Sequence, residues 1–295
     1  MASLGTRTII EIQSQPECWQ RAVDLGSTVK GLPEPGERVL VLGCGTSFYI
    51  AQAYASLREG SGLGETDAVV ASEMPQPLRR KYDRAIAISR SGTSVELLVA
   101  VQQLPESLPV TAVLGDVKTP LADGRYDVVD LGFADESSLV QTRFATTVLS
   151  LLRVANGEDL QAEIQAARIA VEDQLPPLPE RQLVVLAHGW STALAQEAAL
   201  KCREAAAAWV ESYLAGEYRH GPLAVADDRT LVWGLTPLTV VLSDSIRATG
   251  ARIQQPSHPP QAELIRLQRL AVQWATANGR DADDPAHLGR SVTNV

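Results

Sequence analysis

Residues 41–52 read VLGCGTSFYIAQ, and residues 185–196 read VLAHGWSTALAQ. The two segments share Val, Leu, Gly, Ser, Ala and Gln at matching positions. In each segment a short apolar run leads into a tight glycine turn, and a serine then begins a helical pattern. A strand, a turn and a helix therefore occur twice, and this repeat predicts two related α/β lobes.

The segments around both copies extend the same alternation of strands and helices. Near-continuous apolar runs, typical of parallel strands buried on both faces, lie at residues 38–43, 68–72, 84–89, 110–115 and 126–131. Helical patterns cover residues 46–60, 93–103 and 138–174, the last with a break at Asn156-Gly157. The proline-rich stretch at 173–182 separates the halves. We predict an α/β protein with two doubly wound, flavodoxin-like parallel-sheet lobes in pseudo-repeat, divided as 1–172 and 173–295.

The composition narrows the class of protein. The net charge is -9 and the pI about 5.0, which argues against a nucleic-acid partner. No apolar run approaches the roughly 20 residues that span a bilayer, and no secretory signal is evident. Three widely spaced cysteines suit reduced thiols in a cytoplasm, and the four histidines show no metal-ligand spacing. We expect a cytoplasmic protein with no membrane partner, no metal site and no cofactor.

Two polar loops of the first half follow predicted strands and begin helices. One is GCGTS at 43–47 and the other is SRSGTS at 89–94. Helix N-termini favour anions, and hydroxyl groups add hydrogen-bond donors. The loops therefore predict a phosphate site at the carboxyl ends of the strands, with five hydroxyl groups from Thr46, Ser47, Ser89, Ser91 and Ser94. The alternative is that each serine merely caps its own helix. Neither a P-loop nor a dinucleotide fingerprint is present.

A third polar segment, ESSLVQTRFATT at 136–147, leads into another helical pattern. Gln141, Thr142 and Arg143 could close the site there. A capping role for Glu136 and the two serines after it is the other interpretation.

A carboxylate and an imidazole stand out in the second half. Glu204 lies among small and apolar residues, which predicts a partly buried group suited to proton transfer. His220 follows sixteen residues later, beyond a helix expected to end near Gly216. Because sixteen helical residues span about 24 Å, the two would meet only through a return of the chain or across a dimer interface. An ordinary ion pair of Glu204 with Lys201 is the simpler alternative.

Together these motifs resemble the sugar isomerase (SIS) domain family. The resemblance rests on CGTS, SRSGTS, LVQTRFATT and AALKCREAAAAWVESYLAGEYRHGPLA, and it covers nearly the whole chain as two SIS lobes. The chain is most similar to the isomerase half of glucosamine-6-phosphate synthase and to stand-alone phosphosugar isomerases, deaminases and deglycases. The resemblance implies a small-molecule sugar phosphate as substrate, a cis-enediol or enolamine intermediate and no cofactor.

The resemblance also implies roles for individual residues. Glu204 falls on the acid/base that moves a proton between C1 and C2, Lys201 on a lysine beside it, and His220 on the ring-opening histidine that the neighbouring subunit of a homodimer supplies. Further substrate contacts are expected from Cys44, Gly45, Thr46, Ser47, Ser89, Arg90, Ser91, Ser94, Gln141 and Arg203.

Two departures from the synthase limit the comparison. Residue 2 is Ala, and about 40 residues precede the first strand, so glutamine-driven amination is not expected. Arg290 occupies the place of the synthase's Schiff-base lysine, and arginine does not form an imine under ordinary conditions. The expected activity is therefore that of an aldose/ketose isomerase or an amino-sugar-phosphate deaminase. The alternatives are a fructosamine-6-phosphate deglycase and a non-catalytic sugar-phosphate sensor.

Overall fold

The computed structural model describes residues 4–26 and 28–293, which fall into two compact units. The first lobe comprises the described residues within 17–137, 141–160 and 289–295. The second lobe comprises those within 1–16, 138–140 and 161–288. These units assign residues 161–172 to the second lobe and the C-terminal tail to the first. The division at 172/173 remains a prediction about domains.

The first lobe contains a five-stranded parallel sheet in the order β2-β1-β3-β4-β5. Its strands are β1 (Val39–Gly43), β2 (Thr66–Val70), β3 (Arg84–Ser89), β4 (Val110–Leu114) and β5 (Asp127–Asp130). All five predicted strands are present. The apolar runs are explained by burial on both faces, because every residue of β1 and β4 is buried.

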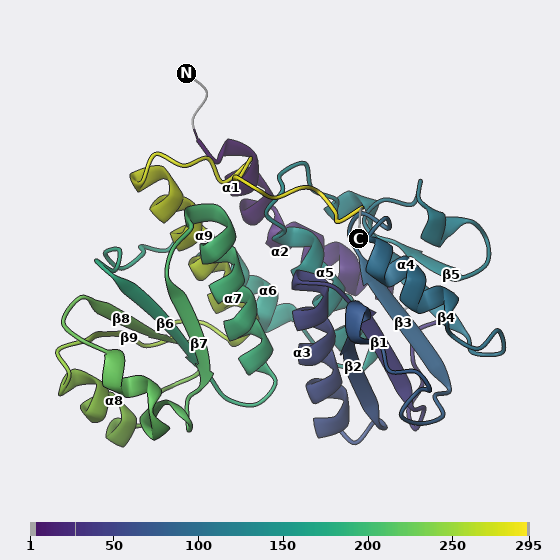
Figure 1. The fold of residues 1–295 in the computed structure, drawn as a ribbon, viewed down its shortest axis with the longest axis horizontal. Coiled ribbons are helices and arrows are strands. Elements are labelled where there is room, and N and C mark those ends of the chain that lie inside the picture. Colours follow the sequence, from purple (N-terminus) through teal and green to yellow (C-terminus); the bar gives the residue numbers. More distant parts are fainter. Residues whose placement is uncertain (1–3, 27, 294–295) are drawn as a thin grey trace. The chain divides into compact units, whose positions relative to one another are not determined.

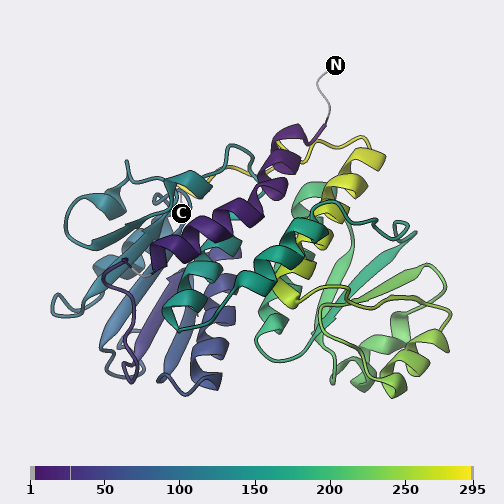
Figure 2. The same ribbon diagram turned by 180° about the vertical axis from the view of Figure 1, so that it is seen from behind.

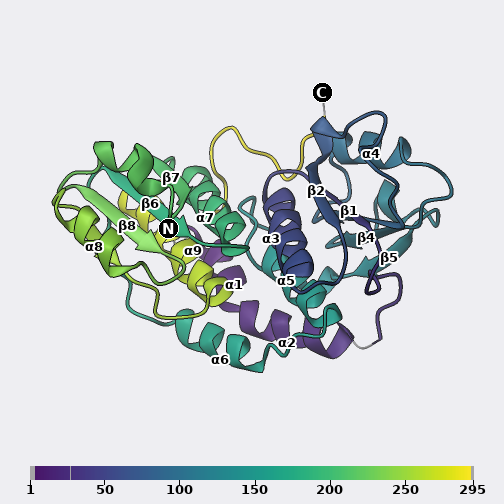
Figure 3. The ribbon, with the colours of Figure 1, turned by 90° about the horizontal axis from the view of Figure 1, so that it is seen from below.

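Helices cover both faces of this sheet, as the doubly wound prediction requires (Figure 3). They are α2 (Gln15–Gly26, from Glu17 on), α3 (Thr46–Gly60), α4 (Val95–Gln102) and α5 (Arg143–Ala155). Helix α4 packs through Leu97 and Val101 on a core that includes Leu40 and Leu42. Helix α3 contacts β1, β2 and α5 (Figure 1). The predicted helix at 46–60 matches α3, and the predicted break at Asn156 is where α5 ends.

The second lobe repeats the strand order on a smaller scale. Its parallel sheet runs β7-β6-β8-β9, formed by β6 (Gln182–Ala187), β7 (Val210–Leu214), β8 (Thr230–Gly234) and β9 (Arg252–Gln254). The helices are α1 (Thr6–Gln13), α6 (Gln161–Ala170), α7 (Ser191–Ala206), α8 (Val240–Arg247) and α9 (Pro260–Ala277). Helix α8 covers one face with Leu242 and Ile246. Helix α7 packs on β6, β7 and α9, and α9 in turn contacts α6 and α1 (Figure 2).

The repeated motif is equivalent in the two lobes. After β1 the chain turns at Gly45 with φ +53°, and after β6 it turns at Gly189 with φ +57°. Helices α3 and α7 begin within two residues of these glycines. Glycine suits both positions because the left-handed region is costly for residues with a Cβ atom. The predicted α/β fold with two parallel-sheet lobes in pseudo-repeat is confirmed.

Candidate functional site

The two serine loops lie side by side in the first lobe. Strands β1 and β3 pair in parallel, so the loops that follow them leave the same edge of the sheet. This edge is where the strand order β2-β1-β3 reverses direction, which is the usual ligand position in an open α/β sheet. One loop leads into α3 at Thr46, and the other leads into α4 at Val95. The N-termini of α3 and α4 therefore both lie at this edge.

The hydroxyl groups of these loops are not simply helix caps. Thr46, Ser47, Ser89 and Ser91 are buried. Ser94 is the N-cap of α4, yet its side chain makes no capping hydrogen bond. At the equivalent point of the second lobe the hydroxyl of Thr239 accepts a hydrogen bond from the Leu242 N–H at 3.3 Å. Helix capping therefore explains the hydroxyl of Thr239 in the second lobe, but it does not explain the hydroxyl of Ser94 in the first lobe.

The second serine loop is held in a tight turn. The Ser89 hydroxyl accepts a hydrogen bond from the Gly92 N–H at 2.9 Å, and the Ser91 hydroxyl accepts one from the Thr93 N–H at 3.3 Å. Gly92 has φ +62°, and a Cβ there would lie 2.2 Å from the Thr119 hydroxyl oxygen. Only glycine fits this position, so the turn fixes where the serine side chains point.

The C-terminal tail lies against the same loop. Arg90 Nη2 donates to the Arg290 carbonyl at 2.8 Å, and the Val95 N–H donates to the Val292 carbonyl at 3.1 Å. The Arg290 guanidinium contacts both carboxylate oxygens of Asp135, at 2.7 and 2.8 Å, and the Glu136 carbonyl. Arg290 therefore anchors the tail to the first lobe. This contact gives the arginine a role that needs no imine chemistry.

The third polar segment combines both interpretations. The Glu136 carboxylate accepts hydrogen bonds from the Thr142 hydroxyl at 2.8 Å and the Arg143 N–H at 2.9 Å, so it caps α5. Gln141, in contrast, has a buried Oε1 that accepts no hydrogen bond within the described part of the chain. An unused amide oxygen is what a ligand-binding glutamine requires.

In the second lobe Lys201 connects two carboxylates of α7. Its Nζ lies 2.5 Å from Oε2 of Glu204 and 3.4 Å from Oε1 of Glu197. Lys201 and Glu197 side chains are each 1% exposed, whereas that of Glu204 is 21% exposed. Glu204 is thus partly buried, as its surroundings predicted, and it also makes the predicted ion pair with Lys201. Glu197 was not among the predicted site residues, although its i,i+4 spacing to Lys201 on a helix was visible in the sequence.

The long helix predicted between Glu204 and His220 is wrong. Helix α7 ends at Ala206, and Ala207 adopts the left-handed conformation with φ 50°. Residues Val210–Leu214 then form β7, paired in parallel with β6. His220 lies at the end of the 3₁₀ turn Tyr218–His220 (η4) and is exposed. The chain therefore does fold back after Glu204, by a strand rather than by a turn between helices.

A cavity of about 620 Å³ opens beside Glu204 within the second lobe. One wall is the face of α7 and its end, with Leu200, Arg203, Glu204 and Ala207. The other wall is the segment after α9, including Arg280 and His287, which the sequence reasoning did not single out. Arg203 also donates to the Val210 carbonyl at 2.9 Å, which ties the helix end to β7. The volume is in the range of small-molecule sites.

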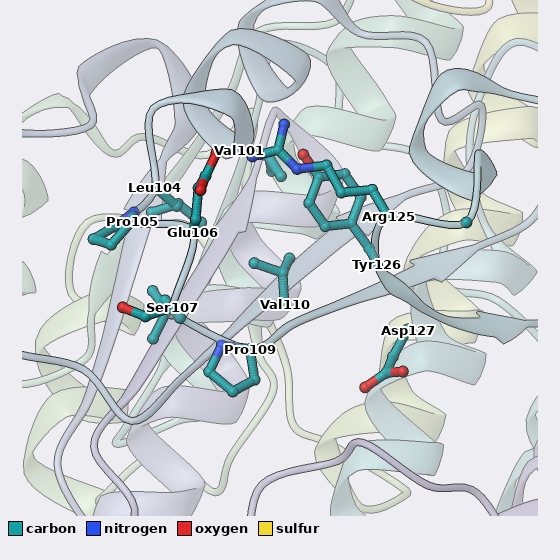
Figure 4. A pocket seen from close by; sticks show the side chains of 12 residues that line it. Val101, Leu104, Pro105, Glu106, Ser107, Pro109, Val110, Arg125, Tyr126 and Asp127 are labelled. Carbon is teal, nitrogen blue, oxygen red and sulfur yellow. The ribbon is translucent and has the colours of Figure 1, made fainter.

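A different cavity, of about 410 Å³, lies at the opposite edge of the first lobe's sheet (Figure 4). Its lining includes Leu104 to Val110 and Arg125 to Asp127, at the amino ends of β4 and β5. The Arg125 guanidinium lies 5.3 Å from the centre of the Tyr126 ring. This cavity lies away from the carboxyl ends where ligands of such sheets gather.

The predicted site residues thus form two groups. The first lobe brings together Cys44, Gly45, Thr46, Ser47, Ser89, Arg90, Ser91 and Ser94 at one sheet edge, with Gln141 just before α5. The second lobe brings together Lys201, Arg203 and Glu204 on α7, and it places His220 beyond β7. Each group belongs to its own lobe.

Several solved structures share this fold. Glucosamine-6-phosphate deaminase from Thermotoga maritima matches with a TM-score of 0.79 and 22% identity over 97% of this chain and 99% of its own. Tagatose-6-phosphate ketose/aldose isomerase from Escherichia coli matches with a TM-score of 0.75 and 21% identity, over 97% of each chain. No family model matches the chain.

Curated proteins of similar sequence include isomerizing aminotransferases. The isomerizing glutamine–fructose-6-phosphate aminotransferase of Pyrobaculum aerophilum is 29% identical over 96% of this chain, and that of Sulfurisphaera tokodaii is 26% identical over 92%. The chain therefore resembles the SIS-domain phosphosugar isomerases in sequence and in fold. It spans about half the length of the curated relatives it matches, 56% and 52% of these two. Within the described residues, no helix is long and apolar enough to cross a membrane.

Proposed function

We propose that the chain is a phosphosugar enzyme, either an aldose/ketose isomerase or an amino-sugar-phosphate deaminase. The observation that carries the proposal is Glu204, a partly buried carboxylate 2.5 Å from the Lys201 ammonium and on the wall of a 620 Å³ cavity. A carboxylate fixed in this way suits proton transfer between neighbouring carbons. The named activities of the relatives and structural neighbours, on fructose, glucosamine and tagatose 6-phosphates, support the substrate class.

In the proposed reaction the serine loops bind the phosphate. Their hydroxyl groups and the N-termini of α3 and α4 supply donors without a positive side chain having to enter. Glu204 takes a proton from one carbon of the C1–C2 pair and returns it to the other, while Lys201 holds the carboxylate in place. If C2 carries an amino group, the resulting imine is hydrolysed and ammonia leaves.

The test is proton NMR in D₂O with a panel of hexose and hexosamine 6-phosphates, with ammonia assayed in parallel. Loss of the C2 proton signal supports enolisation, and ammonia then separates a deaminase from an isomerase. Glu204→Gln should abolish exchange while substrate still binds. Ser91→Ala should weaken substrate binding, since a phosphate contact is lost. Binding without exchange across the whole panel would instead support a sugar-phosphate sensor.

We also propose a homodimer in which His220 serves the neighbouring subunit. His220 is exposed and lies after β7, beyond the strand that follows the helix carrying Glu204. Mixing an inactive Glu204→Gln chain with an inactive His220→Asn chain should restore part of the activity, because one site of the mixed dimer keeps both groups. Absence of recovery in a verified mixed dimer would contradict this arrangement.

A further inference from the structure

The cavity beside Glu204 has a second feature that the proposed reaction has not used. Among residues 4–26 and 28–293, only two non-glycine residues have positive φ, Ala207 at 50° and His287 at 67°. Both line this cavity, Ala207 at the end of α7 and His287 in the segment after α9. Residues held in sparsely populated backbone conformations cluster at functional sites, where the surrounding structure fixes them. His287 is therefore a candidate functional residue of this cavity.

The other three histidines have different positions. His258 lies 2.7 Å from the Asp173 carboxylate, and its side chain is 9% exposed. His188 follows β6 and His220 follows β7. Among the described residues, His287 is the histidine that lines the same cavity as Glu204 within one chain.

The chemistry of the proposed reaction needs a second proton-transfer group. When Glu204 takes a proton from carbon, the electron pair forms a C=C bond and the carbonyl oxygen must gain a proton. In the second half of the reaction the neighbouring hydroxyl or amino group loses a proton, its C=O or C=N bond forms, and the other carbon of the pair is protonated. Histidine is the side chain most often used for such transfer near neutral pH. A carboxylate and an imidazole that line the same cavity would divide the transfers, the carboxylate at carbon and the imidazole at oxygen or nitrogen.

We propose that His287 is the catalytic partner of Glu204, giving a proton to the substrate's carbonyl oxygen and then taking one from the neighbouring hydroxyl or amino group as the product forms. The inference rests on the proposed function and deepens it. The charged groups that line the cavity with His287 are Arg203 and Glu204 from α7, and Arg280, Asp281 and Asp284 from the segment after α9. Asp281 already accepts hydrogen bonds from the N–H groups of Gly5 and Asp283.

The test is His287→Asn, because asparagine tolerates a left-handed backbone and removes the titrating ring. We expect kcat for C2-proton exchange to fall by about 10²-fold or more, with substrate affinity nearly unchanged. The pH profile of kcat should lose the limb that reports the imidazole. His287→Gly, which also accepts positive φ, should show the same loss. His258→Asn is the matched control, since it makes the same change at a histidine that pairs with Asp173 and does not line the cavity.

A ring-specific readout separates chemistry from folding. In protein labelled with ¹³C in its histidine rings, the signal absent from His287→Asn should shift when a competitive sugar phosphate binds. If Glu204→Gln abolishes exchange while His287→Asn keeps kcat within about threefold and an unchanged pH profile, less than the smallest contribution usual for such a group, the inference fails and the proposed function stands. If no substrate exchanges, or Glu204→Gln stays active, the proposed function itself fails.

Discussion

The two carboxylates bound to Lys201 should respond differently to the same substitution. Glu197 and Lys201 are both 1% exposed and lie 3.4 Å apart. Removing one partner of a buried ion pair costs about 3–5 kcal/mol, and because Glu204 still faces Lys201 we expect Glu197→Gln to cost about 3 kcal/mol of unfolding free energy. Glu204 is 21% exposed. Solvent screening then reduces the expected cost of Glu204→Gln to about 1 kcal/mol.

The loss of activity should follow the opposite order, with Glu204→Gln losing more activity than Glu197→Gln. Glu204→Gln removes the group that carries the proton, so C2-proton exchange should fall by about 10²–10⁴-fold. Urea unfolding measures the stability difference, provided that the m-value stays constant among the variants. Exchange of the substrate's C2 proton in D₂O measures the activity. A Glu204→Gln variant that loses as much stability as Glu197→Gln, or that keeps its activity, would refute this reasoning.

Three further predictions follow from individual contacts. Arg290→Ala should release the tail at a global cost below about 1 kcal/mol, since the pair is partly exposed, and hydrogen exchange of the Val95 amide should accelerate. Gly92→Ala should weaken phosphate binding, measured by calorimetry, because its Cβ would lie 2.2 Å from the Thr119 hydroxyl oxygen; unchanged affinity would show that the turn does not shape the site. Burial alone would raise the pKa of Asp283, but hydrogen bonds from the first turn of α1 hold it below the ordinary 3.8. The stability from Asp283 should therefore be complete above pH 4 and lost as the pH falls through the lowered pKa, so Asp283→Asn should be destabilised by about 1 kcal/mol at neutral pH and match the wild type in acid unfolding.

The sequence alone contained the elements that depend on local patterns. The strands were visible because parallel strands buried on both faces need continuous apolar runs. The starts of α3 and of the serine loops were visible because glycine and serine have distinct uses at the turns between strands and helices. The residues of the proposed phosphate site followed from these positions. The resemblance to the SIS family then identified Glu204 and Lys201 among many charged residues.

Only the tertiary structure decided where α7 ends. The alanine-rich stretch after Glu204 has high helix propensity, and local reasoning extended the helix to Gly216. Residues 210–214 are a strand because they pair with Leu183–Ala187 of β6, a contact that propensity cannot represent. Local preference is worth less than 1 kcal/mol per residue, so pairing and burial against a sheet override it.

Tertiary packing also decided which segments line the cavity beside Glu204 and where the C-terminal tail binds. His287 lines the same cavity as the end of α7, although some 80 residues separate them in the chain. The Arg290 carbonyl receives its hydrogen bond from Arg90, a sequence separation of 200 residues. Such contacts form only when the packing of whole elements brings distant segments together. The sequence therefore determined which chemical groups are present, and the packed fold determined which of them face one another.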